Sequence, residues 1–583
     1  MKPLINPRLG DAEDDASSPK SRSLWSITGT LLAEVSLPKL LLSWVMLIAL
    51  PALLLGVGPL IATAWLRAIS DKVAVLAGLG SLLLLLLVAV AGWVVGWPLY
   101  RMAERGFWSL NALAVQPAYA LCREGLRHLT EGLMKHPEAA RRSRLRAVAA
   151  AGGGLFVSAT SVLLIALAWP FTRWIGEAAD LILPHRLVIP SLANGVLLVA
   201  VYVAVAALVW GTADATSDQP ADLDAFDMPP ESGRVWRVAH LSDLHIVGGR
   251  YGFRIESGRM GPQGNDRAER TMTTLERVHA DRPVDIILVT GDMTDAGSSA
   301  EWAEFFDLMA RFPALAERML ILPGNHDVNV VDRANPARLD LPFSSGKQLR
   351  RLRTLSAIAA IQGNRVRLAN PTTNGRLGSA LSDMVSSHRD TITAFADSGA
   401  LRLTFEISDV WAKCFPMVLP PDGEDGLGVV LLNSNAETHF SFTNALGLVS
   451  TEQAMCIAAL NEQFPRAHWI VALHHHLVEY PAPAKAFSER IGTALINGSW
   501  FARELQAFAN RLVVMHGHRH IDWIGTCGKL RIVSAPSTVM AATGDGGTHF
   551  HIHTLAAGPD GLYLLAPEKV EVSEERAQAP ASL

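Results

Sequence analysis

Four long stretches without a charged residue constrain this chain more than any other feature of its sequence. They are Leu40–Leu66, Val73–Tyr100, Ala147–Thr172 and Leu187–Ala213. Each is longer than the roughly 20 residues that a helix needs to cross a bilayer. Hydrophobic residues make up 50% of the 583 residues and charged residues only 18%, which is too apolar for a purely soluble protein. The sequence therefore predicts four transmembrane helices within residues 40–213.

The arginines and lysines between these stretches indicate which side of the membrane each loop faces. Residues 101–146 hold nine of them: Arg101, Arg105, Arg123, Arg127, Lys135, Arg141, Arg142, Arg144 and Arg146. The segment between the third and fourth stretches holds only Arg173 and Arg186. Because loops rich in arginine and lysine stay in the cytoplasm, we expect a multi-pass protein of the cell (inner) membrane. Its basic loop, its N-terminus and everything after Ala213 should face the cytoplasm.

The four stretches contain no Asp, Glu, Lys, Arg or His. Transporters and channels need ionisable groups within the membrane, so we expect these helices to form an anchor and not a pathway. Gly152, Gly153 and Gly154 could let helices approach closely, and a homo-oligomer formed through the transmembrane helices is one expectation.

The rest of the chain divides into a tail, a linker and a long region of alternating elements. Residues 1–39 are expected to be a mobile cytoplasmic tail, and residues 214–233 a linker. From 234 to 566, short apolar runs alternate with helical stretches, which is typical of an α/β domain. Within it, residues 344–400 resemble a helical insertion that could cap a site. Residues 567–583 are expected to be a disordered tail.

Polar clusters directly follow five of the predicted strands. Seven strands are predicted: Val235–Leu241, Ile286–Thr290, Met319–Leu322, Val429–Asn433, Trp469–Leu473, Leu512–Met515 and Leu530–Ser534. The polar clusters are Asp243–His245, Gly291–Asp295, Gly324–Asp327, His474–His476 and His516–His520. The carboxyl ends of parallel strands meet at one edge of a sheet, so the clusters should converge. Carboxylates, imidazoles and an amide together fit a pair of divalent metal ions such as Mn, Fe, Zn or Co.

The order D-x-H, G-D-x-x-D, G-N-H-D, H and G-H-x-H resembles the calcineurin-like metallophosphoesterase superfamily. The resemblance covers about Val235–Leu565, and Leu431–Asn435 and Ser534–Ser537 share it. It implies a sandwich of two β-sheets flanked by helices, here preceded by the four-helix transmembrane region.

The resemblance also implies a role for each residue of the clusters. One metal would be held by Asp243, His245 and His520, and the second by Asn325, His474 and His518, with Asp292 bridging the two. A hydroxide between the metals would attack phosphorus. His326 would donate the proton to the leaving group, oriented by Asp295. His475 and Arg519 are weaker candidates for contacts with substrate. His549, His551 and His553 alternate, and we expect them to line one face of a late strand and not to hold a third metal.

These features predict a membrane-anchored metallophosphoesterase, a hydrolase of phosphoric ester bonds and more specifically a phosphodiesterase. Its substrate would be a cyclic nucleotide or a lipid-linked phosphodiester at the bilayer surface. With 51 basic and 55 acidic residues, the chain offers no basic field for a nucleic-acid polymer. The alternative is a non-catalytic sensor or binding protein for a phosphate ligand on the same fold. A transporter is disfavoured by the uncharged spans.

Overall fold

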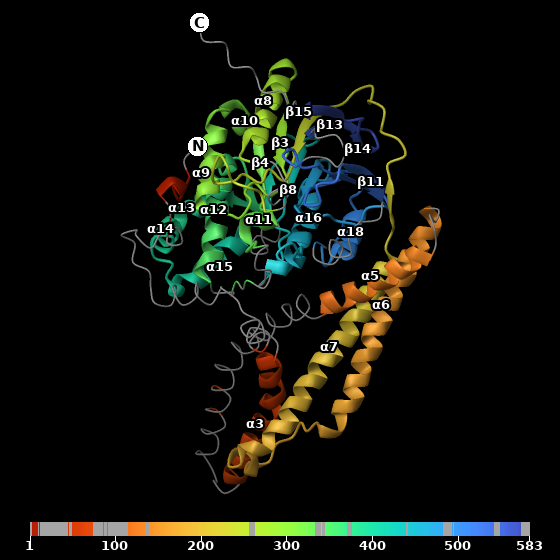
Figure 1. Cartoon of the computed structure of the whole chain (residues 1–583), viewed down its shortest axis with the longest axis vertical. Helices are drawn as coiled ribbons and strands as arrows, with labels where there is room; N and C mark the ends of the chain where they lie inside the picture. The colour runs from red at the N-terminus through yellow and green to blue at the C-terminus, as the bar shows by residue number, and fades with distance from the viewer. Residues whose placement is uncertain are drawn as a thin grey trace. The chain divides into compact units, whose positions relative to one another are not determined.

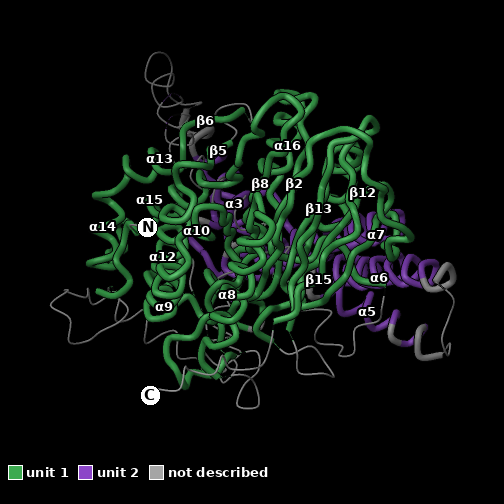
Figure 2. The backbone as a smooth tube through the Cα atoms, turned by 90° about the horizontal axis from the view of Figure 1, so that it is seen from above, with its two compact units in different colours: residues 1–35, 218–583 green, residues 36–217 purple. Residues whose placement is uncertain are grey.

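The computed structural model places the chain in two compact units. It describes residues 3–9, 11, 49–73, 115–133, 139–255, 263–332, 344–369, 376–438, 441–481, 495–540 and 548–572, with isolated positions between them. One unit holds residues 1–35 and 218–583, and the other holds residues 36–217 (Figure 2). Each unit is considered separately below.

The smaller unit is helical. Its described helices are α3 (Leu50–Val73), α5 (Gln116–Leu133), α6 (Ala139–Ala168) and α7 (Val188–Thr216). Two segments, Ser143–Phe171 and Pro184–Thr216, are long and apolar enough to cross a membrane, with mean hydropathies of 1.9 and 2.5. They cover the third predicted span except its last residue, Thr172, and the whole of the fourth. The first predicted span overlaps α3. The apolar part of this helix, Ala52–Ala68, is shorter than the two candidate spans. Nearly all of the second predicted span lies outside the described residues. Length and composition thus support two candidate spans, and a four-helix transmembrane region stays a prediction.

Glycines bring these helices together within one chain. Helices α6 and α7 lie side by side (Figure 1). A side chain at Gly154 of α6 would meet the main-chain oxygen of Ala207 at 2.6 Å and the Cα atom of Gly211 at 2.9 Å. A side chain at Gly153 would meet the backbone nitrogen of Arg123 in α5 at 2.8 Å. The close packing that the glycines predict therefore occurs inside the chain, and these glycines are not available to join subunits.

The larger unit is a sandwich of two sheets. In the six-stranded sheet, β2 (Val235–Leu241), β3 (Ile286–Val289) and β4 (Met319–Ile321) are parallel neighbours. On the other side of β2 lies the antiparallel β13 (Thr548–Gly558), which also pairs with β14 (Gly561–Leu564) and β15 (Glu568–Val572). The nine-stranded sheet has the order β1-β11-β12-β10-β9-β8-β7-β5-β6. Its parallel centre is β8 (Leu427–Leu431), β9 (His468–Ala472), β10 (Leu512–His516) and β12 (Leu530–Ser534).

Alternating side chains give the larger sheet two apolar faces. In β10, Val513 and Met515 join the core that the two sheets share, whereas Leu512 and Val514 face a second cluster. Helices α16 (Thr451–Gln463) and α18 (Gly498–Gln506) contribute to this second cluster. Helices α8 (Asp266–Asp281) and α9 (Ser299–Ala310) contribute to the shared core. All seven predicted strands are present, and the expected two-sheet sandwich with helices on its faces is confirmed.

Several boundaries differ from the sequence-based expectation. The predicted linker contains β1 (Pro220–Asp222), which pairs with β11 (Trp523–Cys527), and the predicted tail contains β15. The segment 344–400 is not an external cap: α12 (Ser345–Gln362) is buried and packs on β4. The segment also supplies β5 (Arg367–Ala369) and β6 (Leu377–Ala380), which join β7 (Met417–Leu419) at the edge of the larger sheet.

The N-terminal segment packs on the sandwich and is not free there. The carboxylate of Asp11, 2% exposed, accepts two hydrogen bonds of 2.6 Å from the guanidinium of Arg353 in α12. The amide of Ile5 donates to Ser356 Oγ at 3.0 Å. Arg353 also donates to the main-chain oxygen of Gly297 at 3.0 Å. Residues 3–9 and 11 are thus part of the α/β unit, contrary to the expected mobile tail.

Candidate metal centre

The structure brings together all seven predicted metal ligands at the carboxyl edge of both sheets. Five of them have a backbone in the left-handed region: φ is 54° at Asp243, 41° at His245, 52° at Asp292, 74° at His518 and 53° at His520. No other described residue except glycine has a positive φ. This conformation costs free energy and persists only where the surrounding structure requires it, which is typical of functional sites.

The first group of ligands comes from the loops after β2 and β10. His520 Nε2 lies 3.2 Å from Asp243 Oδ1 and 3.4 Å from His245 Nε2. His245 Nε2 lies 3.8 Å from Asp292 Oδ2. Asp243, His245 and His520 can therefore present one donor atom each to a single ion.

The second group comes from the loops after β3, β4, β9 and β10. His474 Nε2 lies at its centre, 3.3 Å from Asp292 Oδ2, 3.0 Å from Asn325 Oδ1 and 3.1 Å from His518 Nδ1. Asp292 lies within reach of both groups. Two groups that share one carboxylate are the arrangement expected of a dinuclear centre.

The outer hydrogen bonds of two imidazoles fix which ring nitrogen carries a lone pair. His474 donates from Nδ1 to the main-chain oxygen of Thr290 at 2.8 Å, and His518 donates from Nε2 to that of Thr493 at 3.1 Å. When both rings are neutral, the inner nitrogens face each other with lone pairs at 3.1 Å. A shared metal ion, or a proton on one ring, relieves their repulsion, so the donor set fits a divalent metal ion.

The electrostatics of the site also require a cation. Burial opposes ionisation of Asp292, but the imidazoles of His474 and His326 hold the pKa of this carboxyl well below its usual value. Burial likewise opposes protonation of His474, yet the carboxylates of Asp292 and Asp243 raise its pKa to about 9. Without a metal, a proton on His474 balances part of the buried negative charge.

Glycines at the strand ends leave room for the ligands. A side chain at Gly324 would meet Asp292 Oδ1 at 2.0 Å. Gly291 has a φ of 97°, and its side chain would meet His474 Nδ1 at 2.4 Å. The backbone at Gly291 and at Gly324 therefore comes closer to a neighbouring ligand than a residue with a side chain would allow.

His326 lies beside the centre, but its partner differs from the expected one. Its Nδ1 donates to the main-chain oxygen of Asp295 at 2.7 Å, whereas the Asp295 carboxylate is 4.0 Å away. That carboxylate instead accepts from His245 Nδ1 at 3.2 Å and from the amide of Ile255 at 2.6 Å. The prediction that the Asp295 side chain orients His326 is therefore corrected: the side chain holds a predicted metal ligand, and the main chain holds His326.

Asp327 organises two of the loops, a role that the sequence analysis did not assign. Its buried carboxylate accepts hydrogen bonds from the amide and the hydroxyl of Thr294, at 2.9 and 2.7 Å, and from the amide of Gly324 at 2.9 Å. Burial, together with the nearby Asp292 carboxylate, raises the pKa of Asp327 to about 6. Its position three residues after Gly324, at the start of the helical turn α11 (Asn325–Val328), is the only signal of this role in the sequence.

The two weaker candidates for substrate contacts differ in accessibility. His475 is fully buried, and its Nδ1 lies 2.9 Å from Ser434 Oγ. It packs behind His474 and His518, with ring centroids 5.1 and 4.5 Å away, so in this conformation it supports the ligands and does not face substrate. Arg519 is partly exposed and donates to Thr493 Oγ1 at 3.1 Å; its contact with substrate stays a prediction.

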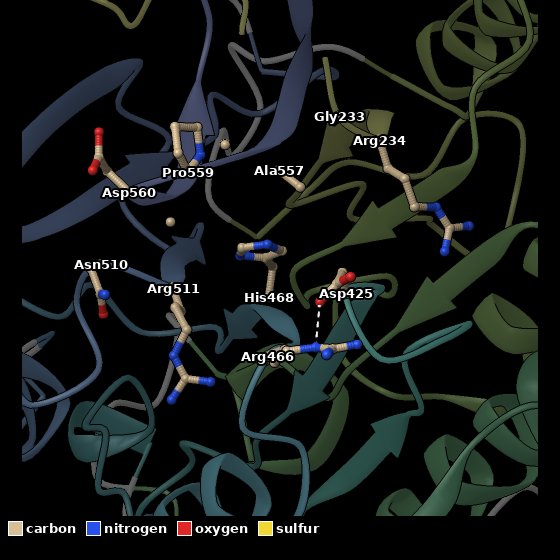
Figure 3. Close-up of a pocket in the computed structure, with 12 residues that line it drawn as sticks. Gly233, Arg234, Asp425, Arg466, His468, Asn510, Arg511, Ala557, Pro559 and Asp560 are labelled. Atoms are coloured by element: carbon tan, nitrogen blue, oxygen red, sulfur yellow. Dashed lines mark ion pairs between the residues drawn. The ribbon is translucent and has the colours of Figure 1, made fainter.

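A cavity of about 440 Å³ lies at the opposite, amino-terminal edge of the strands. Arg234, His468 and Arg511, which lie at or just before the starts of β2, β9 and β10, line it (Figure 3). Its arginines already have partners, because Arg466 pairs with Asp425 at 2.9 Å and Arg511 donates to the main-chain oxygen of Pro465 at 2.6 Å. This cavity contains none of the predicted site residues.

The sequence of residues 237–522 matches the family described as calcineurin-like phosphoesterase. Residues 237–522 are a calcineurin-like phosphoesterase domain. The expected superfamily and the expected class, a hydrolase acting on phosphoric esters, are thereby confirmed for this domain. The match contains all seven predicted ligands together with His326 and Asp295.

Solved structures with a similar phosphoesterase fold share little sequence with the chain. A dimetal phosphatase from Danio rerio is 10% identical, with 58% of this chain and 99% of that chain covered and a TM-score of 0.33. The calcineurin-like phosphoesterase YfkN from Bacillus subtilis is 11% identical, with 59% of this chain and 91% of that chain covered and a TM-score of 0.29. A Staphylococcus aureus protein described as a candidate 5′-nucleotidase is 13% identical, with 59% and 55% covered and a TM-score of 0.31, so the chain spans about half of its length. No curated protein matches the chain in sequence.

Proposed function

We propose that the chain is a membrane-anchored, two-metal phosphoesterase, and more specifically a phosphodiesterase. The observation that carries the proposal is the position of Asp292, whose Oδ2 lies 3.8 Å from His245 Nε2 in one ligand group and 3.3 Å from His474 Nε2 in the other. Two metal ions held by these groups would supply an activated water as nucleophile and offset the charge of the phosphoryl oxygens. Their identity among Mn, Fe, Zn and Co is left to experiment.

The residues of the chain prepare the site for this chemistry. Asp243 and Asp292 provide buried negative charge that would hold the metals, and the turn at Gly324 leaves room for the Asp292 carboxylate. His326 donates its Nδ1 proton to the Asp295 main chain, which leaves Nε2 to hold or release a proton. We assign to Nε2 the transfer of a proton to the departing oxygen, a role that imidazoles commonly have in enzymes.

The location of the N-terminal segment supports the proposed topology. Asp11 and Arg353 form a buried pair, so residues 3–11 and the phosphoesterase domain belong to one folded unit. If the intervening chain spans a membrane, it crosses an even number of times, as the two candidate spans or the four predicted ones both would. Together with the basic residues of segment 101–146, this supports a catalytic domain that faces the cytoplasm.

Two substrate classes fit this arrangement. A cyclic nucleotide would reach the domain from the cytoplasm, whereas a lipid-linked phosphodiester would be concentrated near an anchored domain. A panel of cyclic nucleotides and phospholipids, offered to the purified chain with Mn²⁺, distinguishes them by which is hydrolysed.

The catalytic proposal has a direct test. The purified chain should hydrolyse bis(p-nitrophenyl) phosphate when Mn²⁺ is added, and Asp292→Ala should abolish this activity. Asp307→Ala, which removes an exposed carboxylate, is the matched control and should leave it unchanged. A wild-type chain that is inert with Mn, Fe, Zn and Co would support the second candidate, a non-catalytic sensor of a phosphate ligand.

A further inference from the structure

A second cluster of potential metal ligands lies away from the dinuclear centre, on β13. His549, His551 and His553 occupy alternate positions, so they share one face of this strand, as the sequence analysis predicted. The structure adds Asp522, which follows β10 in the same loop as His518 and His520. The sequence analysis did not connect this residue with the histidines.

The three groups Asp522, His549 and His551 converge on one point. His549 Nε2 lies 2.7 Å from Asp522 Oδ2. His551 Nε2 lies 3.0 Å from Oδ1 and 3.0 Å from Oδ2 of the same carboxylate. The two rings are 5.3 Å apart at an angle of 84°, so both direct Nε2 at the carboxylate from different sides.

This geometry fits a shared cation. His551 Nε2 lies 3.0 Å from both carboxylate oxygens, and His549 Nε2 approaches one of them at 2.7 Å. The candidate donor atoms of the three residues all lie within 4.8 Å of one another. Two imidazoles and one carboxylate are a donor set that zinc and related transition metals accept, with further positions left for water.

The cluster is open enough for an ion to enter and enclosed enough to hold it. The side chains of His549 and His551 are 13% and 10% exposed, and that of Asp522 is 38% exposed. The cluster therefore combines one carboxylate with two imidazoles at a place that solvent reaches.

We propose that Asp522, His549 and His551 bind one divalent transition-metal ion of the zinc class, separate from the dinuclear centre. The ion would join the loop after β10 to β13. Because His520 is two residues before Asp522 in that loop, the bound ion would hold a ligand of the dinuclear centre in position. Asp522 would then act on the reaction through His520 and without touching substrate.

The test counts metal ions per chain in the full-length purified protein. Chains are stripped with a chelator, loaded with Zn²⁺, freed of loosely bound metal by gel filtration and analysed for zinc and protein. The wild type should retain one ion per chain more than His549→Ala/His551→Ala. In an Asp292→Ala background, where the dinuclear centre is impaired, the same double substitution should still remove one ion.

Two further variants keep the test decisive. His388→Ala, which removes a partly exposed imidazole bonded to the Met384 carbonyl, should leave the zinc content unchanged. Asp522→Asn keeps an oxygen that both imidazoles can bond to but removes the charge, so it should lose the additional ion without unfolding the loop. Equal zinc contents in the wild type, Asp522→Asn and the double variant would overturn the proposal. The three side chains would then interact by hydrogen bonds alone.

Discussion

His326 donates from Nδ1 to the main-chain oxygen of Asp295 at 2.7 Å and lies 4.0 Å from the carboxylate of the same residue. The backbone acceptor fixes the orientation and the tautomer of the ring. The side chain of Asp295 is then free to support His245, so one residue serves both halves of the site through two different groups.

Replacing His326 tests its role as proton donor. His326→Ala should leave the metal content near that of the wild type and slow turnover by about 10²–10⁴-fold, the usual contribution of a placed proton donor. Elemental analysis and steady-state rates provide the measurement, with His388→Ala as control. Loss of both metals from the variant would make His326 a ligand.

Replacing Asp295 tests the role of its side chain apart from the role of its main-chain carbonyl. Asp295→Asn keeps the carbonyl that holds His326 but weakens the support of His245, so metal affinity should fall by about 10–100-fold. Activity measured against Mn²⁺ concentration should then recover at high metal, whereas that of His326→Ala should not. A rate that stays low at saturating metal would restore the carboxylate as the partner of His326.

The buried pair between Asp11 and Arg353 should contribute strongly to stability. Asp11→Ala leaves the buried guanidinium without this carboxylate, which typically costs about 3–5 kcal/mol. Arg8→Ala removes a neighbouring pair with Asp307 that is exposed, with side-chain exposures of 47% and 60%, and should cost about 0–1 kcal/mol. Urea unfolding followed by tryptophan fluorescence compares the two. Equal losses of unfolding free energy in the two variants would mean that the N-terminal segment does not stay packed on the domain in solution.

Glu301 should make the stability of the domain depend on pH. Burial outweighs its bonds to the amides of Ser298 and Ala296 and raises its pKa from 4.5 to about 7. The folded state therefore holds this proton more tightly than the unfolded state, so its contribution to stability is full below pH 4.5 and is lost as the pH rises through 7. Relative to Glu301→Gln, the wild type should lose about 3 kcal/mol between pH 4 and pH 8. A constant difference in unfolding free energy between the two proteins would contradict this.

Topology can be checked with a reporter that is active only outside the cytoplasm. Alkaline phosphatase fused after Ala213 should be inactive in cells, and a protease-sensitive tag at the N-terminus should be accessible from the same side. Strong phosphatase activity of the fusion would place the catalytic domain outside.

The sequence predicted the central strands and the convergence of the candidate ligands, because both depend on local patterns. Each ligand cluster directly follows an apolar run, as Asp243 follows β2, and parallel strands bring such ends together. The short edge strands were missed: β1 and β6 lack an apolar run and pair only because a neighbour offers an open edge.

Long-range contacts were the least predictable. Nothing near Asp11 indicates that Arg353 lies beside it, and the choice between the side chain and the main chain of Asp295 depends on the loop conformation. No local pattern indicates that Asp522, in the loop after β10, lies beside His549 of β13.

Because β13 pairs with β2 inside its sheet, this sheet cannot form fully until β13 has been synthesised. This strand pairs with β2 from His551 to Ala556, yet the ribosome makes it after every predicted ligand. A chain that stops at residue 522, where the family match ends, would contain every predicted ligand and still expose the hydrogen-bonding edge of β2. Such a fragment should aggregate instead of hydrolysing substrate, so the cell would gain no activity from unfinished chains.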